Sequence, residues 1–394
     1  MLTLEMIKEA KKTLEGVARV TPLNPAANIG PNVYIKAENL QMTGAFKLRG
    51  AYNKMSSLTP EQAAKGVIAS SSGNHAQGIA YSATKLGIRS IICMPAGAPI
   101  SKIEATKNYG AEVVLVPGVY DDAAAKVNEL VKEHGYIFAH PFNDPYVIAG
   151  QGTIGLEILE QLPEVEQVVV PIGGGGLISG IATAIKSLKP SCKVIGVEAA
   201  GAASMFQSVN ENEIIELKSV STIADGIAVK KPGDLTFDLV RRYVDEIVTV
   251  KEDEIASAIL ALMEGQKTVA EGAGATTVAA VMFGKVDSSK KTVCVVSGGN
   301  IDVNMLSRII TKGLSKSGRI ASIITKVADK PGSLISLLQI ISQTGANIIT
   351  INHSREDKQS DVNACIVTMA LETRNREHIR EIEGLLEKNG YEIM

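Results

Sequence analysis

Segments of near-continuous apolar residues, each followed by a small-residue loop and a helical pattern, constrain the fold of this chain more than any other feature. The apolar runs lack the alternation of a half-exposed strand, as expected when helices cover both faces of a parallel sheet. We therefore predict an α/β region of two lobes with a cleft between them. The predicted strands are residues 32–38, 66–69, 90–94, 112–116, 136–139, 167–172, 193–197, 247–250 and 292–296. The predicted helices are residues 1–20, 48–58, 74–86, 101–109, 121–133, 151–161, 177–188 and two within 253–282.

The last part of the chain repeats neither the spacing nor the glycine loops of the first. Near residue 313 the composition changes to glycine, serine and lysine, which is typical of a linker. We predict a catalytic region over 1–312 with a smaller lobe at roughly 48–146, a linker at 313–319 and a separate domain over 320–394. Its predicted order is strand, helix, strand, strand, helix, strand, a βαββαβ unit.

Charge and cysteine content exclude several classes of partner. The net charge of −2 over 394 residues gives no reason to expect nucleic acid or an anionic membrane. The four cysteines are far apart, which favours a reducing compartment, and no apolar run reaches the ~20 residues of a membrane helix. The first residues contain acids and lack the basic start of a signal peptide. We expect a cytoplasmic protein that acts on small molecules.

One lysine stands out as a candidate nucleophile. Lys47 follows Gly44, Ala45 and Phe46 at the start of a predicted helix. A cation in the first turn opposes the helix dipole, so this position is unfavourable for a lysine that serves only as a solvated surface charge. Apolar neighbours shift a lysine amine toward its neutral, nucleophilic form, which is the chemistry of a Schiff-base lysine.

Two loops at strand-to-helix junctions have the composition of anion sites. Residues 70–74 read Ser-Ser-Ser-Gly-Asn before a helix, and a helix start offers free amides to a carboxylate. The second loop, called the tetraglycine loop below, consists of Gly173, Gly174, Gly175 and Gly176, which let backbone amides converge on a phosphate. It lacks the spacing of a dinucleotide site and the lysine of a Walker loop, which argues against nicotinamide and nucleotide cofactors.

The segment 43–51, Thr-Gly-Ala-Phe-Lys-Leu-Arg-Gly-Ala, resembles the cofactor-lysine motif of pyridoxal-phosphate enzymes of the tryptophan-synthase-β type (fold type II). The chain is most similar to the threonine and serine ammonia-lyases and the serine racemases. Further segments that match the ammonia-lyases are 140–144, 151–153, 224–228 and 270–275. The last 75 residues, with Asp-Lys-Pro-Gly-Ser-Leu at 329–334, resemble an ACT domain, a ferredoxin-like module that commonly binds amino-acid effectors.

The resemblance implies a role for each loop around the cofactor. Lys47 would hold pyridoxal 5′-phosphate and then remove the α-proton of the substrate. The tetraglycine loop would bind the phosphate, Asn74 the 3′-oxygen of the ring, and the hydroxyl of Ser297 the ring nitrogen. A hydroxyl at that nitrogen gives a mild electron sink, which suits β-elimination. The remaining implied contacts are Phe46 and Leu177 for the cofactor, and Ser71, Ser72, Gly73 and His75 with Asn74 for the substrate; on its own, His75 reads as structural.

The implied reaction is β-elimination of L-threonine or L-serine to a 2-oxo acid and ammonia. Ser72 leaves an alternative open, because many threonine ammonia-lyases have alanine there while serine racemases have a serine that protonates the opposite face. A third reading is a non-catalytic amino-acid sensor on an old enzyme fold. Retention of Lys47, Asn74, the loop that starts at Gly173 and Ser297 together argues against it.

Regulation and assembly follow from the same resemblance. The ACT-like domain implies an effector such as isoleucine or valine, hence a role in isoleucine biosynthesis, with Gly332, Leu334 and Asn347 as candidate contacts. Glu198 and the carbonyl of Ala202 fall where relatives bind a cation. Ser204 stands where some relatives carry an acid, which favours a monovalent ion. Strand edges in such domains often pair between subunits, so we expect a homodimer or homotetramer.

Overall fold

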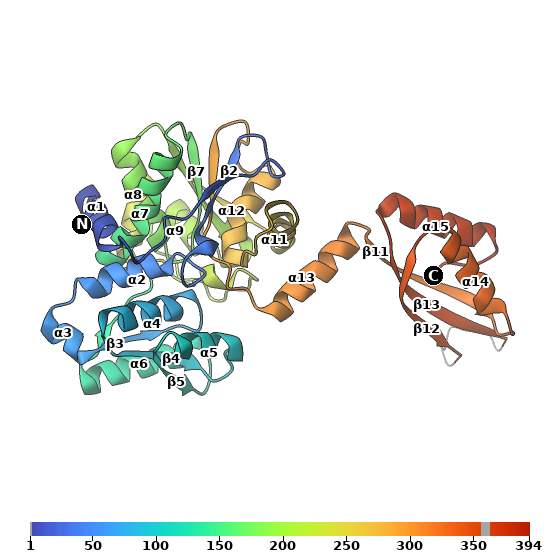
Figure 1. Ribbon diagram of the computed structural model, residues 1–394, viewed down its shortest axis with the longest axis horizontal. Coiled ribbons are helices and arrows are strands. Elements are labelled where there is room, and N and C mark those ends of the chain that lie inside the picture. Colours follow the sequence, from blue (N-terminus) through green and yellow to red (C-terminus); the bar gives the residue numbers. More distant parts are fainter. Residues whose placement is uncertain (1, 356–362) are drawn as a thin grey trace. The chain divides into compact units, whose positions relative to one another are not determined.

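A computed structural model describes residues 2–355 and 363–394. The chain divides into two compact units, an N-terminal unit of residues 1–302 and a C-terminal unit of residues 303–394. Among the described residues, no helix is long and apolar enough to cross a membrane. The predicted sheet-and-helix architecture of both units is confirmed (Figure 1).

The larger sheet of the N-terminal unit has six strands. They are β1 (Leu23–Pro25), β2 (Val33–Ala37), β10 (Thr292–Val296), β7 (Gln167–Pro171), β8 (Lys193–Ala199) and β9 (Glu246–Val250), in that spatial order. All neighbours are parallel except β1 and β2. Strands β7, β8 and β10 are almost completely buried, because helices pack on both faces of the sheet.

Two helix layers cover this sheet. One contains α1 (Leu4–Thr13), α7 (Pro145–Gln161), α8 (Gly176–Leu188) and α10 (Asp234–Tyr243), and its core includes alternate residues of β7 and β10. The opposite face packs against α12 (Gly272–Met282), which contacts α11 (Glu252–Gln266). Helix α9 (Ser204–Glu211) lies near the edge strand β9. The buried residues of α12 are glycine, alanine, threonine and valine, so the helix can lie close to the strands.

The smaller sheet forms the second lobe. Its strands are β5 (Glu112–Val116), β4 (Ser90–Pro95), β3 (Val67–Ser70) and β6 (Ile137–Phe138), all parallel. Alternate residues of β3 and β4 pack on α4 (Asn74–Leu86) and on α6 (Tyr120–His134), so these helices cover opposite faces (Figure 1). The lobe also contains α2 (Lys47–Ser56), α3 (Pro60–Lys65) and α5 (Ile100–Asn108).

The C-terminal unit begins with a helix where a linker was predicted. Helix α13 (Val303–Lys316) covers most of residues 313–319, so the linker prediction is wrong for residues 313–316, and α13 clusters with the C-terminal unit. The unit continues with β11 (Ile320–Ala328), α14 (Ser333–Gln343), β12 (Asn347–Ser354), β13 (Ala364–Glu372) and α15 (Arg376–Lys388). Its antiparallel sheet has the order β11-β13-β12. The predicted last strand is a single bridge from Ile393 to Thr325. The third strand of the predicted βαββαβ order is expected at 361–371, and its first two residues lie outside the described residues.

Candidate active site

Lys47 is the first residue of α2, and the loop after β10 fixes its position. The backbone amide of Phe46 donates to the carbonyl of Ser297 (3.0 Å), and Ala45 forms a bridge with Gly298. The Lys47 amine donates to the carbonyl of Pro141 (2.8 Å) and lies 5.4 Å from the Phe46 ring centre. Burial lowers the pKa of Lys47 to about 8, and the charge of Glu271 opposes this shift. At neutral pH an amine with this pKa has a far larger neutral fraction than an ordinary lysine, so it can act as a base.

The tetraglycine loop lies next to Lys47 through the segment that follows β6. Pro141 accepts from the lysine, and the next residue, Phe142, packs against the loop. A side chain at Gly174 would overlap the Phe142 ring, and one at Gly176 would meet the Phe142 backbone at 3.0 Å. Gly175 has a φ of +93°. The first turn of α8 has no side-chain cap, so its amides remain available to an anion.

Gly173 differs from the other three glycines of the loop. It lies before α8, whose first residue is Gly176, so its amide is not one of the free amides of that helix. A side chain at Gly173 would meet the backbone of Ile227 at 2.9 Å and the side chain of Val229 at 3.2 Å. This close approach is by itself a reason for glycine here. The structure therefore places Gly173 in the predicted loop, but its contact with the phosphate stays a prediction.

Asn74 stands in a chain of three polar side chains at the start of α4. Asn300 donates its side-chain amide to Asn74 Oδ1 (2.8 Å) and to the carbonyl of Thr43 (2.8 Å). Asn74 donates to Glu271 Oε1 (2.7 Å). These contacts assign the Asn74 amide orientation and leave one N–H for a further acceptor. Burial raises the pKa of Glu271 to about 7, while the Asn74 hydrogen bond works against the shift.

The sequence did not identify Glu271 and Asn300 as site residues. Both lie in segments that the composition or the family match had indicated. Nothing in the local sequence shows that either residue contacts Asn74, which is about 200 residues away in the chain. An acid directly before a segment rich in glycine and alanine was the available sequence signal for Glu271.

The serine loop, residues 70–73, occupies the junction between β3 and α4. Ser71, Ser72 and Gly73 are half-buried, and Gly73 precedes α4 without a side-chain cap. His75, by contrast, is buried and its Nε2 lies 2.8 Å from the carbonyl of Ala139. Burial, together with the charge of Lys47, lowers the pKa of His75 to about 3. The neutral ring therefore donates to Ala139, which is a structural role. The loop itself offers hydroxyls and free helix amides.

Ser297 and Leu177 complete the surroundings of Lys47 and the tetraglycine loop. Ser297 is buried directly after β10, and its carbonyl accepts from Phe46. Leu177 is buried in the first turn of α8. Two loops at carboxyl ends of β7 and β10 thus meet beside one lysine, as ligand sites of open parallel sheets do.

A cluster of buried charges anchors the helix that carries Lys47. Arg49 donates to both oxygens of Glu38 and both of Glu157, over 2.6–3.0 Å. Lys36 donates to Glu157 (2.6 Å), to the carbonyl of Thr21 (2.7 Å) and to Gln161 (2.9 Å). Two cations and two carboxylates balance in a region with almost no exposure.

The three residues predicted for a cation lie together. Glu198 is buried on β8, and Ala202 and Ser204 follow within six residues. Glu198 accepts from the amides of Met205 (3.0 Å) and Phe206 (2.7 Å), so it caps α9. Burial raises the pKa of Glu198 to about 8. The Ser204 hydroxyl is buried with no hydrogen-bond partner among the described residues.

The predicted effector residues do not all meet within one chain. Gly332 and Leu334 lie at the loop after β11 and the start of α14. Asn347 begins β12 opposite Glu372, whereas the end of β11 pairs with Ala364. Asn347 is therefore at the other end of the sheet.

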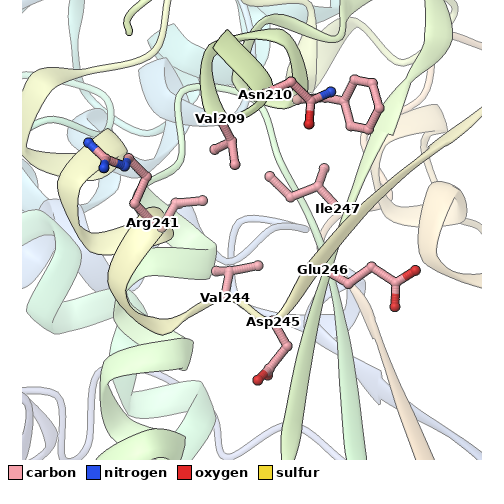
Figure 2. A pocket seen from close by; sticks show the side chains of 9 residues that line it. Val209, Asn210, Arg241, Val244, Asp245, Glu246 and Ile247 are labelled. Atoms are coloured by element: carbon pink, nitrogen blue, oxygen red, sulfur yellow. The ribbon is translucent and has the colours of Figure 1, made fainter. Parts of the chain in front are cut away.

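A separate pocket of about 320 Å³ lies at the edge of the larger sheet (Figure 2). Its labelled side chains come from α9, from α10, from the two residues between α10 and β9, and from the start of β9, and one of them, Asp245, already pairs with Lys186. None of the predicted site residues is among those that line it.

The described residues fit pyridoxal phosphate. A lysine with a lowered pKa, an uncapped glycine-lined helix start for a phosphate, and a free amide hydrogen on Asn74 lie within one connected set of contacts. Each supplies a group that this cofactor needs.

Comparison with known proteins gives the same result. The family profile described as pyridoxal-phosphate dependent enzyme matches residues 14–298. An L-threonine ammonia-lyase of Thermotoga maritima is 52% identical, over 100% of this chain and 99% of its own length. The catabolic L-threonine dehydratase TdcB of Escherichia coli K12 is 49% identical over 78% of this chain and 96% of its own. The solved structure of maize serine racemase aligns with a TM-score of 0.74 and 37% identity, over 80% of this chain and 98% of its own. The chain belongs to the pyridoxal-phosphate-dependent enzymes of fold type II, and within them to the threonine ammonia-lyases.

Proposed function

We propose that this protein converts L-threonine to 2-oxobutanoate and ammonia, and L-serine to pyruvate and ammonia. Water leaves across the α and β carbons, and water re-enters when the resulting enamine hydrolyses, so the net products are the 2-oxo acid and ammonia. The observation that carries the proposal is the position of the Lys47 amine. It donates to the carbonyl of Pro141, and the next residue, Phe142, packs against the tetraglycine loop. The full-length relative from Thermotoga maritima supports it.

The residues of the site divide the work between binding and proton transfer. Bound pyridoxal phosphate supplies the electron sink that makes the α-proton acidic. Lys47 Nζ takes that proton, because burial gives it a pKa of about 8. The amides at the start of α8, with those of the loop from Gly173 onward, would hold the phosphate. The hydroxyl of Ser297 would serve the ring nitrogen and the remaining N–H of Asn74 the ring oxygen, and Phe46 and Leu177 would form apolar walls.

The serine loop binds the substrate. Ser71 and Ser72 present their hydroxyls, and the first turn of α4 presents its amides, at an uncapped helix start where the dipole favours a carboxylate; the Gly73 amide itself donates to Ser71 Oγ (3.2 Å). His75, buried in the first turn of this helix, keeps the loop in place through Ala139.

Ser72 supports a second candidate activity, racemisation of serine. Its hydroxyl lies in the half-buried loop, and the maize relative is named a serine racemase. Incubation with L-serine followed by chiral analysis of the residual amino acid separates the two. Accumulation of D-serine that disappears in Ser72→Ala supports racemisation. Its absence in the wild-type protein limits the enzyme to elimination.

The C-terminal unit binds an amino-acid effector, with isoleucine and valine as the first candidates. Strand β12 is an exposed sheet edge, and antiparallel pairing with a second copy would carry Asn347 toward the Gly332 loop of that copy. The effector site would then require a homodimer or homotetramer. Inhibition by isoleucine would favour a biosynthetic role, whereas insensitivity would favour the catabolic role named for the Escherichia coli relative.

A monovalent cation fits the Glu198 neighbourhood. The unpartnered Ser204 hydroxyl and the buried carboxylate supply oxygen donors, and Ala202 can add its carbonyl. Activity in potassium compared with tetramethylammonium salts tests this, and equal activity in both would contradict it.

A steady-state assay of 2-oxo acid release tests the main proposal. We expect turnover of threonine and serine by a purified protein that carries the visible absorbance of its cofactor. A protein that binds the cofactor and turns over neither amino acid would instead be the non-catalytic sensor. The preference between threonine and serine rests on one methyl group, worth about 1–3 kcal/mol.

A further inference from the structure

Three side chains with metal-ligand atoms gather at one end of the sheet in the C-terminal unit. Asp329 follows β11, His353 lies near the end of β12, and Cys365 lies near the start of β13. One potential ligand atom from each of them lies within 4.8 Å of those of the other two. His353 Nε2 is 2.8 Å from Cys365 Sγ.

The strand register explains why these residues share one face. Cys365 lies opposite Val327, and Asp329 is two residues beyond Val327. His353 lies opposite Val367, which is two residues beyond Cys365. Because side chains alternate between faces with a period of two, all three are on the face that carries the core residue Val367.

We propose that Asp329, His353 and Cys365 bind a zinc ion, with a fourth position open to water or a small solute. Thiolate, imidazole and carboxylate are the protein ligands that zinc takes, and three of them with one open position form an accessible tetrahedral site. Cys365 is buried while Asp329 and His353 are exposed, so an ion can enter from solvent.

The surrounding contacts orient two of these ligands. Arg355 donates to both oxygens of Asp329 (2.9 and 3.0 Å), which fixes the carboxylate and leaves further lone pairs for a metal. The Cys365 thiol donates to the carbonyl of Val327 (3.2 Å). Zinc binding replaces that proton, which passes to solvent, so the affinity rises with pH.

The experiment uses the full-length protein with its pyridoxal phosphate bound, titrated with Co²⁺ as a spectroscopic substitute for zinc. We expect one Co²⁺ per chain, visible tetrahedral bands, near-ultraviolet thiolate-to-metal absorption, and loss of the bands when Zn²⁺ is added. Cys365→Ser should remove the thiolate absorption. His353→Gln should weaken binding at least about tenfold, since even changes in the second shell cost that much.

Cys192→Ser is the matched control, because Cys192 is also buried but lies in the N-terminal unit. It should bind Co²⁺ like the wild-type protein, and circular dichroism should show that all three variants fold. If the wild-type protein binds no Co²⁺, the cluster is a His–Cys hydrogen bond beside an ion pair and the proposal is wrong. Thiolate absorption that persists in Cys365→Ser, or that disappears in the control, also overturns it.

Discussion

Two lysines eleven residues apart, Lys36 buried and Lys47 half-buried, have opposite surroundings. Lys36 has three acceptors, one for each of its N–H bonds, and one of them is the carboxylate of Glu157. Lys47 has one acceptor, the carbonyl of Pro141, and no carboxylate within hydrogen-bonding distance among the described residues. Burial lowers the pKa of both amines, but two carboxylates oppose the shift at Lys36 and only Glu271 does so at Lys47. A paired buried amine keeps its charge neutralised by its partner, whereas an unpaired one is available for chemistry.

The difference is invisible in the local sequence. Lys36 lies between Ile35 and Ala37 on a buried strand, so the criterion of apolar neighbours selects it as readily as Lys47. What separates them is Glu157, which is 121 residues from Lys36 in sequence and reaches it from α7. Glycine loops near a lysine are therefore a better sequence signal of reactivity than apolar neighbours alone.

The largest effect is expected from removing the unpaired amine. Lys47→Ala should lower turnover of threonine by about 10⁴-fold or more, because it removes the base and the point of cofactor attachment. The visible absorbance of the bound cofactor should change with it. Lys54→Ala is the control on the same helix, since the Lys54 amine is paired with a carboxylate, Asp144 (2.7 Å). Substantial turnover in Lys47→Ala would mean that Lys47 is not required for the reaction, and the functional contrast with Lys36 would be wrong.

The next largest effect is expected from unpairing the structural lysine. Glu157→Ala leaves Lys36 and Arg49 without a shared carboxylate, and breaking a buried pair costs about 3–5 kcal/mol of unfolding free energy. We expect a lower midpoint in chemical denaturation, with normal kcat in the fraction that folds. Glu160→Ala, three residues along α7, removes an exposed partner of Lys11 and should cost at most about 1 kcal/mol. Equal losses in the two variants would mean that the buried cluster adds no special stability.

Much of the fold could be predicted because the strands are buried on both faces. The helix predicted at 74–86 and the buried strand predicted at 292–296 have the same bounds in the structure. Helices α3, α9, α10 and α13 were not predicted; the first three have 6, 8 and 10 residues, and the end of α13 has the composition of a linker. Residues 313–316 look like a linker by their glycine and serine content, yet they are helical as the last turn of α13, whose Ile309 is buried.

The site could be predicted only as far as local motifs reach. Lys47, the serine loop and the tetraglycine loop each show their chemistry in consecutive residues. Even within the tetraglycine loop, the sequence does not reveal that Gly173 approaches Ile227 while Gly174 approaches Phe142. Glu271 and Asn300 act through contacts with Asn74 that close only when the two lobes pack. Such roles depend on three-dimensional proximity, which the spacing of residues in one sequence does not encode.

A third prediction concerns the histidine that shares the buried surroundings of Lys47. The pKa of His75 is about 3 in the folded protein and about 6.5 when unfolded, so below pH 6.5 the unfolded chain binds a proton that the folded one does not. His75 therefore removes about 2 kcal/mol of stability between pH 7.5 and 5. Between these pH values the free energy of unfolding of His75→Asn should therefore fall by about 2 kcal/mol less than that of the wild-type protein. Denaturant unfolding at pH 7.5 and at pH 5 measures this difference. His134→Asn, an exposed control, should behave as wild type. Parallel losses in both variants would contradict a neutral buried ring.

The smallest expected effect tests Glu271, the carboxylate whose charge acts on Lys47. Because burial raises the pKa of Glu271 to about 7, its ionised form, which accepts from Asn74, predominates only above that pH. We expect kcat/KM of the wild-type protein to rise with pH through about 7. Glu271→Gln keeps an acceptor for Asn74 but cannot ionise, so this inflection should disappear, with about a tenfold lower rate at the optimum. The exposed Asp225 also raises the pKa of Glu271, so Asp225→Asn should move the inflection slightly lower and leave the maximal rate within about twofold. An inflection near 7 that survives in Glu271→Gln would show that another group titrates. Glu271 would then have no effect on Lys47 during catalysis, in line with the absence of a hydrogen bond between them among the described residues.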